Sequence, residues 1–526
     1  MAHPRDRSLR MSVMGTPRKP AQALAGVLSA LAALGVGHAV AAAMSRPAAS
    51  PLIAVGSVAV DAAPTPVKET AVRLLGNWDK PVLIGGIAVV LLVAAAGIGL
   101  LAWRRPRTAL VSIGALGLVG SGAALLRAGF ASGGAWSAVP SIVAGVVGVT
   151  ALVLITRASQ PLATSEDRTD TPTVTDGSRR RFIATLAGVG LLAAVGAGVG
   201  EAVNRTRLAA RELIRLPRPK SAASPIPDGV QVAGVQTFTT PNDAFYRVDI
   251  SLITPRVDVG AWKLTIDGGV DRPLELTYDQ LLELPMIERD ITVACVSNEV
   301  GGAYVSSARW LGVPFSEILS RVGVEPGVDQ VFSYSSDSGY TCSTPYAAVS
   351  DGRDAMIAVG MNGQPLPDAH GFPARMVVPG LFGFVSATKW LKRIEFTTYA
   401  ERTAYWTERE WATDAPVLTQ SKIEVPKSLG TLGSGGMIGG TAWAQHRGID
   451  KVEIRIDDGD WQDVTLAETA GIDTWRQWSY RYEGSAGRHT AQVRATDGSG
   501  EVQPEERTKV FPSGARGWHQ IQFSVD

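Results

Sequence analysis

The stretch ITVACVSNEVGGAYVSSARWLG, residues 291–312, decides the fold prediction for the second half of the chain. Its β-branched start, Ile291–Ala294, predicts a strand that ends at Cys295 and passes into a Ser/Asn/Gly loop. A side chain at that point suits chemistry, because the strand end is rigid and the loop can approach a ligand. Thiolates bind soft metals such as copper, zinc and iron, and by extension molybdenum. A free cysteine is also often a small buried hydrophobic residue, so position alone leaves both roles open.

The chain has only two cysteines, Cys295 and Cys342. Their number and spacing match neither a zinc site nor a disulfide framework. A single disulfide between them is possible outside the cytosol. That pairing would compete with any metal-ligand role of Cys295.

The composition divides the 526-residue chain into two unlike halves. Residues 1–204 are rich in Ala, Gly, Leu and Val, whereas the remainder has an ordinary globular composition. The length allows two or three domains. The formal net charge of +1 does not indicate a nucleic-acid partner, and we expect none.

The first half predicts a membrane region, since a span needs about 20 apolar residues. Lys and Arg cluster before the first apolar segment and in alternate connections, which predicts a cytoplasmic N-terminus and an outer C-terminal half. The run Pro51–Val60 is too short to span and is expected to be re-entrant or interfacial. The five predicted spans are residues 21–44, 81–103, 108–130, 136–156 and 182–204.

The segment SRRRFI, Ser178–Ile183, precedes the last predicted span. It resembles the twin-arginine export signal, although an ordinary basic anchor is also possible. Both interpretations place the C-terminal half outside, so we expect a multi-pass cell-membrane protein with an extracytoplasmic catalytic domain. His38 is the only histidine inside a predicted span, and a membrane b-type haem needs two axial histidines, so no haem is expected.

Two motifs carry a resemblance to a known family. ARWLG, Ala308–Gly312, follows Cys295, and MNGQPLPDAHGFPARMVVPGLFGFVSATKWLKRI occupies Met361–Ile394. Both resemble the molybdopterin domain of the sulfite oxidase family, in which a strand delivers one cysteine to molybdenum. The resemblance covers about residues 235–526. It implies a molybdenum–molybdopterin cofactor with Cys295 as the metal ligand.

The same resemblance implies further site residues. Tyr340, five residues before Pro345, matches a tyrosine that faces the metal, although the residues alone also allow a half-buried strand tyrosine. A Thr-Pro-Asn segment and a basic set are expected to hold the pterin and its phosphate, for which guanidinium and ammonium groups are suited. The predicted catalytic residues are Cys295 and Tyr340, and the predicted cofactor-binding residues are Asn242, Tyr246, Arg247, Cys295, His370, Arg375 and Lys389.

From about Pro416 the pattern changes to short alternating strands with frequent turn signals, which predicts a β-sandwich. This part resembles the immunoglobulin-like dimerisation domain of the family, so a homodimer is possible. The expected fold is therefore multidomain: a five-helix membrane region, an α+β molybdopterin domain and an immunoglobulin-like β-sandwich. The predicted boundaries are 1–204 for the membrane region, 205–234 for a linker, 235–412 for the oxidoreductase domain and 413–526 for the sandwich.

The chain departs from the family where sulfite would bind. Glu299 stands where the family carries arginine, and Val248 aligns with a sulfite-binding arginine, with Arg247 beside it. A carboxylate near the metal would repel a dianion. We therefore expect a membrane-anchored oxidoreductase that transfers an oxygen atom to or from a small molecule, S- or N-oxide reduction being favoured, with an unidentified electron-transfer partner. The alternatives are a sulfite dehydrogenase and a non-catalytic, membrane-tethered binding or assembly protein.

Overall fold

A computed structural model describes residues 19–64, 67, 74, 79–128, 134–159, 176–336, 339–433 and 435–526. The chain forms two compact units. Unit 1 comprises Met1–Ala209 and Ser251–Arg256, and unit 2 comprises Ala210–Ile250 and Val257–Asp526. We describe each unit by itself.

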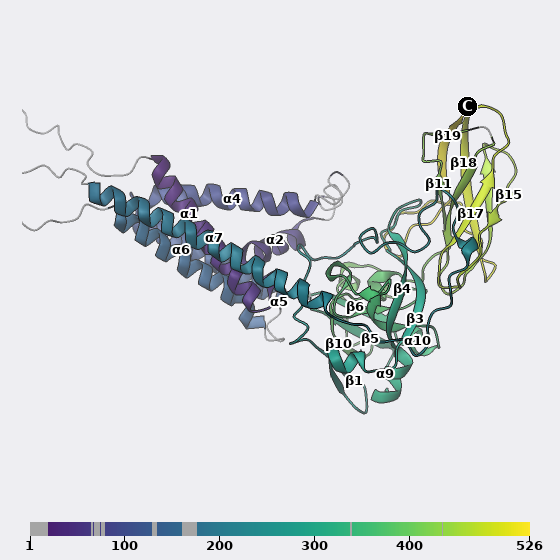
Figure 1. Cartoon of the computed structure of the whole chain (residues 1–526), viewed down its shortest axis with the longest axis horizontal. Helices are drawn as coiled ribbons and strands as arrows, with labels where there is room; N and C mark the ends of the chain where they lie inside the picture. The colour runs from purple at the N-terminus through teal and green to yellow at the C-terminus, as the bar shows by residue number, and fades with distance from the viewer. Residues whose placement is uncertain are drawn as a thin grey trace, which may run out of the picture. The chain divides into compact units, whose positions relative to one another are not determined.

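Unit 1 is helical (Figure 1). Within the described ranges, five of its helices are long and apolar enough to cross a membrane, at Lys19–Ala43, Lys80–Ala102, Pro106–Leu126, Gly134–Ala158 and Arg179–Val203. They agree with the five predicted spans, and the predicted short run forms the 12-residue helix α2. The helices are α1 (Lys19–Ala43), α2 (Pro51–Ala62), α4 (Asp79–Ala102), α5 (Pro106–Ala128), α6 (Val139–Ala158) and α7 (Asp176–Glu212).

Small residues form the contacts between these helices. Gly26 of α1 lies against Gly99 of α4, and Gly117 of α5 lies against Gly145 of α6, so close that an added Cβ atom would clash with the facing backbone. Close approach of backbones through small residues is typical of helices packed in lipid. Helix α7 runs on to Glu212, beyond the predicted end of the last span.

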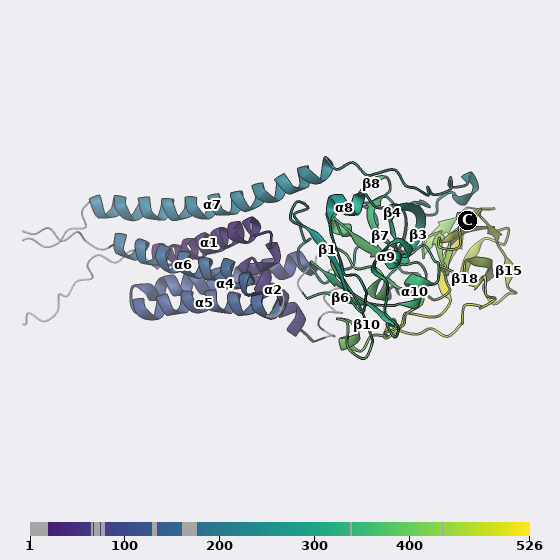
Figure 2. The same ribbon diagram turned by 90° about the horizontal axis from the view of Figure 1, so that it is seen from below.

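The predicted oxidoreductase region of unit 2 contains two sheets (Figure 2), one mixed, with β1 parallel to β10, and one entirely antiparallel. One sheet has the order β2-β1-β10-β5-β6, and the other has the order β3-β4-β7-β8, with β9 paired to β7. Their strands are β1 (Lys263–Gly268), β2 (Leu274–Thr277), β3 (Ile287–Ala294), β4 (Val305–Pro314), β5 (Gln330–Ser335), β6 (Thr341–Pro345), β7 (Met356–Met361), β8 (Gln364–Pro365), β9 (Arg375–Val377) and β10 (Leu391–Thr397).

Local sequence signals account for several of these elements. Thr277 caps α8 (Tyr278–Leu282) through a capping box with Gln280, as the threonine predicts. Helix α9 (Phe315–Val322) ends at Gly323, which has a φ of 65°. The short helix α10 covers Ala347–Ser350. The buried strand β7 is apolar throughout, as expected for a strand covered on both faces.

The C-terminal part of unit 2 consists of two sheets, with orders β11-β13-β17-β16 and β12-β19-β18-β14-β15. Their inner faces share one hydrophobic core that includes Trp478, Ile454 and Phe523. The two-sheet arrangement agrees with the predicted sandwich. The strands are β11 (Gln420–Val425), β12 (Gly430–Leu432), β13 (Met437–Trp443), β14 (Ile449–Ile456), β15 (Gln462–Asp463), β16 (Thr465–Leu466), β17 (Arg476–Arg481), β18 (Gly487–Asp497) and β19 (His519–Val525).

Candidate active site

The cysteine loop, residues 295–304, connects β3 to β4. The backbone N–H of Cys295 donates to the carbonyl of Tyr304 at 2.9 Å, and the N–H of Asn298 donates to the carbonyl of Cys295 at 3.1 Å. The side-chain oxygen of Asn298 accepts from the Tyr304 N–H at 2.8 Å. These bonds fix the loop at both ends. The prediction that a strand delivers Cys295 to a loop is confirmed.

The sandwich braces this loop from outside at Gly301, which has a φ of 78°. An added Cβ atom at Gly301 would clash with the imidazole of His519, the first residue of β19. That imidazole is fixed in turn, because its Nδ1 accepts from the Ile423 N–H at 2.9 Å. Glycine is required at this position for both backbone conformation and space. Burial also lowers the pKa of His519 to about 4, so the bracing ring is neutral at ordinary pH.

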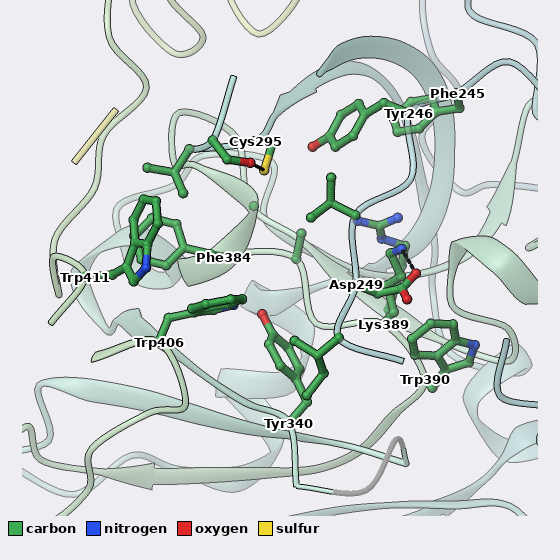
Figure 3. A pocket seen from close by; sticks show the side chains of 17 residues that line it. Phe245, Tyr246, Asp249, Cys295, Tyr340, Phe384, Lys389, Trp390, Trp406 and Trp411 are labelled. Atoms are coloured by element: carbon green, nitrogen blue, oxygen red, sulfur yellow. Dashed lines mark hydrogen bonds and ion pairs between the residues drawn. The ribbon is translucent and has the colours of Figure 1, made fainter. Parts of the chain in front are cut away.

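A cavity of about 170 Å³ lies beside Cys295. One side, which we call the cationic wall, is formed by Arg375 and Lys389. The other side, which we call the aromatic wall, is formed by Phe384, Trp406 and Trp411; Figure 3 shows these rings across the cavity from Lys389. The remaining lining residues are Phe245, Tyr246, Val248, Asp249, Ile250, Cys295, Val296, Ser297, Tyr340, Gly383, Ala387 and Trp390.

The two thiols are both free, so the disulfide that the sequence left open is absent from the described chain. Cys295 lines the cavity, and its Sγ lies 2.9 Å from the hydroxyl of Ser297. Burial raises the pKa of the Cys295 thiol, while hydrogen bonds from Ser297 and the charge of Lys389 lower it. Cys342 is buried instead in β6, where its thiol donates to the carbonyl of Phe384 at 3.2 Å. Of the two thiols, Cys295 alone lines the cavity.

Arg375 is a buried cation, with 3% of its surface exposed. Its Nη1 donates to the carbonyl of His370 at 3.2 Å, and its guanidinium lies 4.9 Å from the ring centre of Trp310. No carboxylate forms an ion pair with it in the part of the chain that the structure describes. Burial lowers the pKa of Arg375 to about 10, which still leaves it charged at neutral pH.

Lys389 differs from Arg375 because it has a carboxylate partner. Its Nζ lies 3.2 Å from Asp249, and Asp249 also binds the guanidinium of Arg247 at 2.9 Å. Burial is the main cause that lowers the pKa of Lys389 to about 8, and Asp249 opposes it. Arg247 points to this carboxylate and is not one of the cavity-lining residues. The prediction that Arg247 contacts the cofactor is therefore not supported by its placement.

His370, whose carbonyl binds Arg375, and Asn242 do not line the cavity. The His370 Nε2 donates to the backbone carbonyl of Asn242 at 2.7 Å, which assigns the ring proton to that nitrogen. The Nδ1 of His370 is buried and has no hydrogen-bond partner in the described structure. Burial lowers the pKa of His370 to about 4, so the ring is neutral and Nδ1 is a hydrogen-bond acceptor. The expectation of a basic group at His370 therefore needs correction.

Two tyrosines direct their hydroxyls into the cavity (Figure 3). Tyr246 points toward Cys295, and Tyr340 points between the two walls. Burial is the largest cause that raises the pKa of each phenol well above its usual value. Both hydroxyls therefore stay protonated and can donate hydrogen bonds to a bound molecule.

The residues present fit molybdenum–molybdopterin. A buried guanidinium without a carboxylate and a buried ring nitrogen without a partner are both costly, and an anionic ligand with hydrogen-bonding groups would satisfy them. Arg375 and His370 supply these two groups, and Cys295 supplies a free thiol at the cavity. A metal, a pterin and a phosphate together need all three kinds of contact.

Two features of the cavity differ from the predictions made from the sequence: the position of Glu299 and the presence of the aromatic wall. Glu299 is exposed and does not line the cavity, so the predicted repulsion of sulfite by its carboxylate is wrong. Val248 does line the cavity, as the alignment with the family implied. The aromatic wall was not predicted, although two tryptophans five positions apart, Trp406 and Trp411, were a visible signal.

Comparisons with known proteins agree with this geometry. The family described as oxidoreductase molybdopterin binding domain matches residues 251–406. The mitochondrial sulfite oxidase of Homo sapiens is 28% identical over 350 residues, which cover 55% of this chain and 62% of that protein. A nitrate reductase [NADH] of Solanum lycopersicum is 34% identical over 177 residues, covering 29% of this chain and 19% of that protein. The chain thus spans less than two thirds of these relatives.

Among solved structures, the sulfane dehydrogenase SoxCD from Paracoccus pantotrophus is 24% identical with a TM-score of 0.48, over 55% of this chain and 81% of that chain. The family match and the sulfite oxidase relatives, together with a cavity that has the groups the cofactor needs, decide the assignment. Residues 251–406 therefore match the oxidoreductase molybdopterin binding domain family, and this part of the chain is a molybdenum oxidoreductase domain of sulfite oxidase type with molybdenum–molybdopterin as its cofactor.

Proposed function

We propose that this protein is a membrane-anchored oxidoreductase that reduces a small, uncharged or zwitterionic S- or N-oxide. The observation that carries the proposal is the division of the cavity beside Cys295 into a cationic and an aromatic wall. The cationic wall suits the anionic cofactor. The aromatic wall offers a substrate apolar contacts and ring faces, with no basic side chain among its three members.

Each proposed contact with the cofactor uses a side chain that the structure describes. Cys295 would ligate the metal, Arg375 and Lys389 would bind anionic oxygens, and His370, which contacts Arg375 but does not line the cavity, would accept a hydrogen bond at its unpartnered Nδ1. Asn242 acts through His370, because its carbonyl holds the imidazole in place. When bound, the molybdenum cofactor supplies two-electron oxygen-atom transfer.

The substrate contacts come from the other side of the cavity. Phe384, Trp406 and Trp411 would hold the organic groups of the substrate, and their mutual ring contacts of 5.9 and 6.0 Å keep the wall rigid. Tyr340 and Tyr246 remain protonated and would donate hydrogen bonds to the oxide oxygen. Reduction of a sulfoxide consumes two electrons and two protons and releases a sulfide and water, so an electron donor is required.

One observation favours sulfite oxidation as a second candidate. Arg375 lines the cavity and has no carboxylate partner in the described chain, so its charge could attract a dianion if the cofactor leaves it free. Lys389 is less suited to this role, because Asp249 already neutralises it at 3.2 Å. In the oxide-reduction proposal Arg375 binds the cofactor, whereas in the sulfite-oxidation proposal it binds the substrate.

The five apolar helices support membrane anchoring. We propose that the N-terminus is cytoplasmic and that unit 2 is extracytoplasmic, since the basic residues flank the helices in that pattern. Arg179 and Arg180, at the start of α7, belong to the proposed twin-arginine signal. The two-sheet C-terminal region is proposed to be immunoglobulin-like and to form a homodimer. A non-catalytic tether with the same fold remains the alternative to an enzyme.

The test uses the full-length, detergent-solubilised protein. Molybdenum is measured per protein chain, and reduced-dye oxidation is followed with dimethyl sulfoxide, trimethylamine N-oxide and, in the reverse direction with an oxidised dye, sulfite. The proposal expects bound molybdenum and turnover of an oxide in preference to sulfite. Preferred sulfite turnover would support the second candidate, and bound cofactor without any turnover would support the tether.

A further inference from the structure

The hydroxyl of Ser297 forms a hydrogen bond with the sulfur of Cys295. The Oγ–Sγ distance is 2.9 Å, and the contact is visible in Figure 3. Within the described part of the chain, the Ser297 side chain makes no other hydrogen bond. Both residues belong to the turn that the Asn298 N–H closes onto the Cys295 carbonyl at 3.1 Å. The loop backbone therefore presents the hydroxyl to the sulfur.

The direction of this hydrogen bond depends on the state of the sulfur. In the free thiol, either atom can donate. A metal-bound thiolate has no proton, so its sulfur can only accept and the Ser297 hydroxyl must donate. Metal binding by Cys295 thus converts an ambiguous contact into a charge-assisted hydrogen bond to the ligand sulfur.

We propose that Ser297 is a positioning residue that donates to the molybdenum-bound thiolate of Cys295 and thereby raises the reduction potential of the metal. Hydrogen bonds to ligand atoms tune a metal site from outside its coordination sphere. The ligand sulfur carries more negative charge when the metal is reduced. The hydroxyl consequently stabilises the reduced state more than the oxidised state. This inference rests on metal ligation by Cys295 and not on the identity of the substrate.

If Ser297 had a purely structural role, removing its hydroxyl would disturb the loop and release the metal. The loop is closed by backbone groups and by the Asn298 side chain, which accepts from the Tyr304 N–H at 2.8 Å. The Ser297 hydroxyl takes part in none of these bonds. Removing it should leave the loop and the metal in place and change only the electronic state of the site.

The experiment compares full-length Ser297→Ala and Ser297→Thr with the wild type. The matched control is Ser386→Ala, which removes a buried hydroxyl bonded to the Leu381 and Phe382 carbonyls at 3.2 and 3.0 Å, away from the sulfur. The readouts are molybdenum content, the midpoint potential from a redox titration of the Mo(V) electron paramagnetic resonance signal, and the thiolate-to-molybdenum charge-transfer absorption.

We expect Ser297→Ala to keep its molybdenum, to have a lower midpoint potential and to show a shifted charge-transfer band. Ser297→Thr should restore both values, and Ser386→Ala should match the wild type. Loss of molybdenum from Ser297→Ala would overturn the inference, because the hydroxyl would then be needed to hold the metal and not to tune it. An unchanged potential and band in loaded Ser297→Ala would also overturn the inference. A wild-type protein without the charge-transfer band would overturn it together with the Cys295 assignment, whatever the substrate is.

Discussion

Replacing Arg375 with methionine should weaken cofactor binding without destabilising the cofactor-free protein. Arg375 is 3% exposed and has no ion-pair partner among the described residues, so the folded apoprotein carries a buried charge at a cost. The lowering of its pKa from 12.5 to about 10 corresponds to a cost of about 3 kcal/mol at neutral pH. Methionine removes the charge and keeps most of the side-chain volume. It loses two hydrogen bonds, to the carbonyls of His370 at 3.2 Å and Met376 at 3.4 Å, worth together about 2 kcal/mol at most.

The same substitution removes the guanidinium that we propose binds an anionic oxygen of the cofactor. A hydrogen bond to a charged group contributes about 1.5–3 kcal/mol, which corresponds to about 10- to 150-fold in affinity. The apoprotein of Arg375→Met should therefore unfold at the same or a higher urea concentration than the wild type. Its molybdenum and pterin content after purification from a cofactor-producing host should be much lower.

The matched control is Arg393→Met, which removes an arginine outside the cavity that pairs with Asp267 at 2.9 Å and with Glu395 at 3.5 Å. Arg393 and Asp267 are partly exposed and Glu395 keeps its ion pair with Arg402, so the loss should cost about 1 kcal/mol of stability and no cofactor. Denaturation by urea and metal analysis are applied to all three proteins. A clearly destabilised Arg375→Met apoprotein with a normal cofactor content would refute the reasoning, because Arg375 would then be a structural residue.

Three further predictions follow from the described contacts. Gly301→Ala should lose molybdenum, because the added Cβ would clash with the His519 ring and because alanine disfavours the φ of 78° at this position. Metal analysis checks this, and a variant with a full molybdenum content would refute the bracing role. Trp406→Ala should raise the KM for the preferred oxide by about tenfold or more while molybdenum content stays normal, because the aromatic wall loses a ring; unchanged kinetics would remove that wall from the substrate site. Burial lowers the pKa of Lys389 from 10.5 to about 8, so between these pH values the unfolded apoprotein holds a proton that the folded one has released. The free energy of unfolding of the wild-type apoprotein, relative to that of Lys389→Met, should therefore be constant below pH 8 and rise between about pH 8 and 10 by at most about 3 kcal/mol. Urea denaturation of both proteins at pH 7 and 9.5 would measure this rise. A fall over that range would contradict the burial of the charged amine.

Short-range sequence patterns predicted several elements of the fold and the position of Cys295 at the end of a strand. The β-branched residues before Cys295 predicted the strand β3, and Thr277 predicted the start of α8. Alternating strands after Pro416 predicted a sandwich, which the shared core of the two C-terminal sheets agrees with. In each case the deciding residues are neighbours along the chain, so local preferences and periodicity suffice.

The directions of side chains in irregular segments could not be predicted in this way. Glu299 lies in a turn whose backbone bonds point it to solvent, and Arg247 is drawn to Asp249 by an ion pair of 2.9 Å. Trp406 and Trp411 lie in a segment without regular periodicity, and their position against Phe384 depends on contacts distant in sequence. Such contacts are set by the tertiary fold, which no window of sequence contains.

The central claim, that Cys295 and not Cys342 binds the metal, is tested most directly by X-ray absorption at the molybdenum edge of the full-length protein. We predict that Cys295→Ser either shows one sulfur ligand fewer than the wild type or contains no molybdenum. Cys342→Ser should keep the wild-type set of sulfur ligands, because its thiol is buried in β6 and donates to the Phe384 carbonyl. An unchanged number of sulfur ligands in Cys295→Ser would contradict the account.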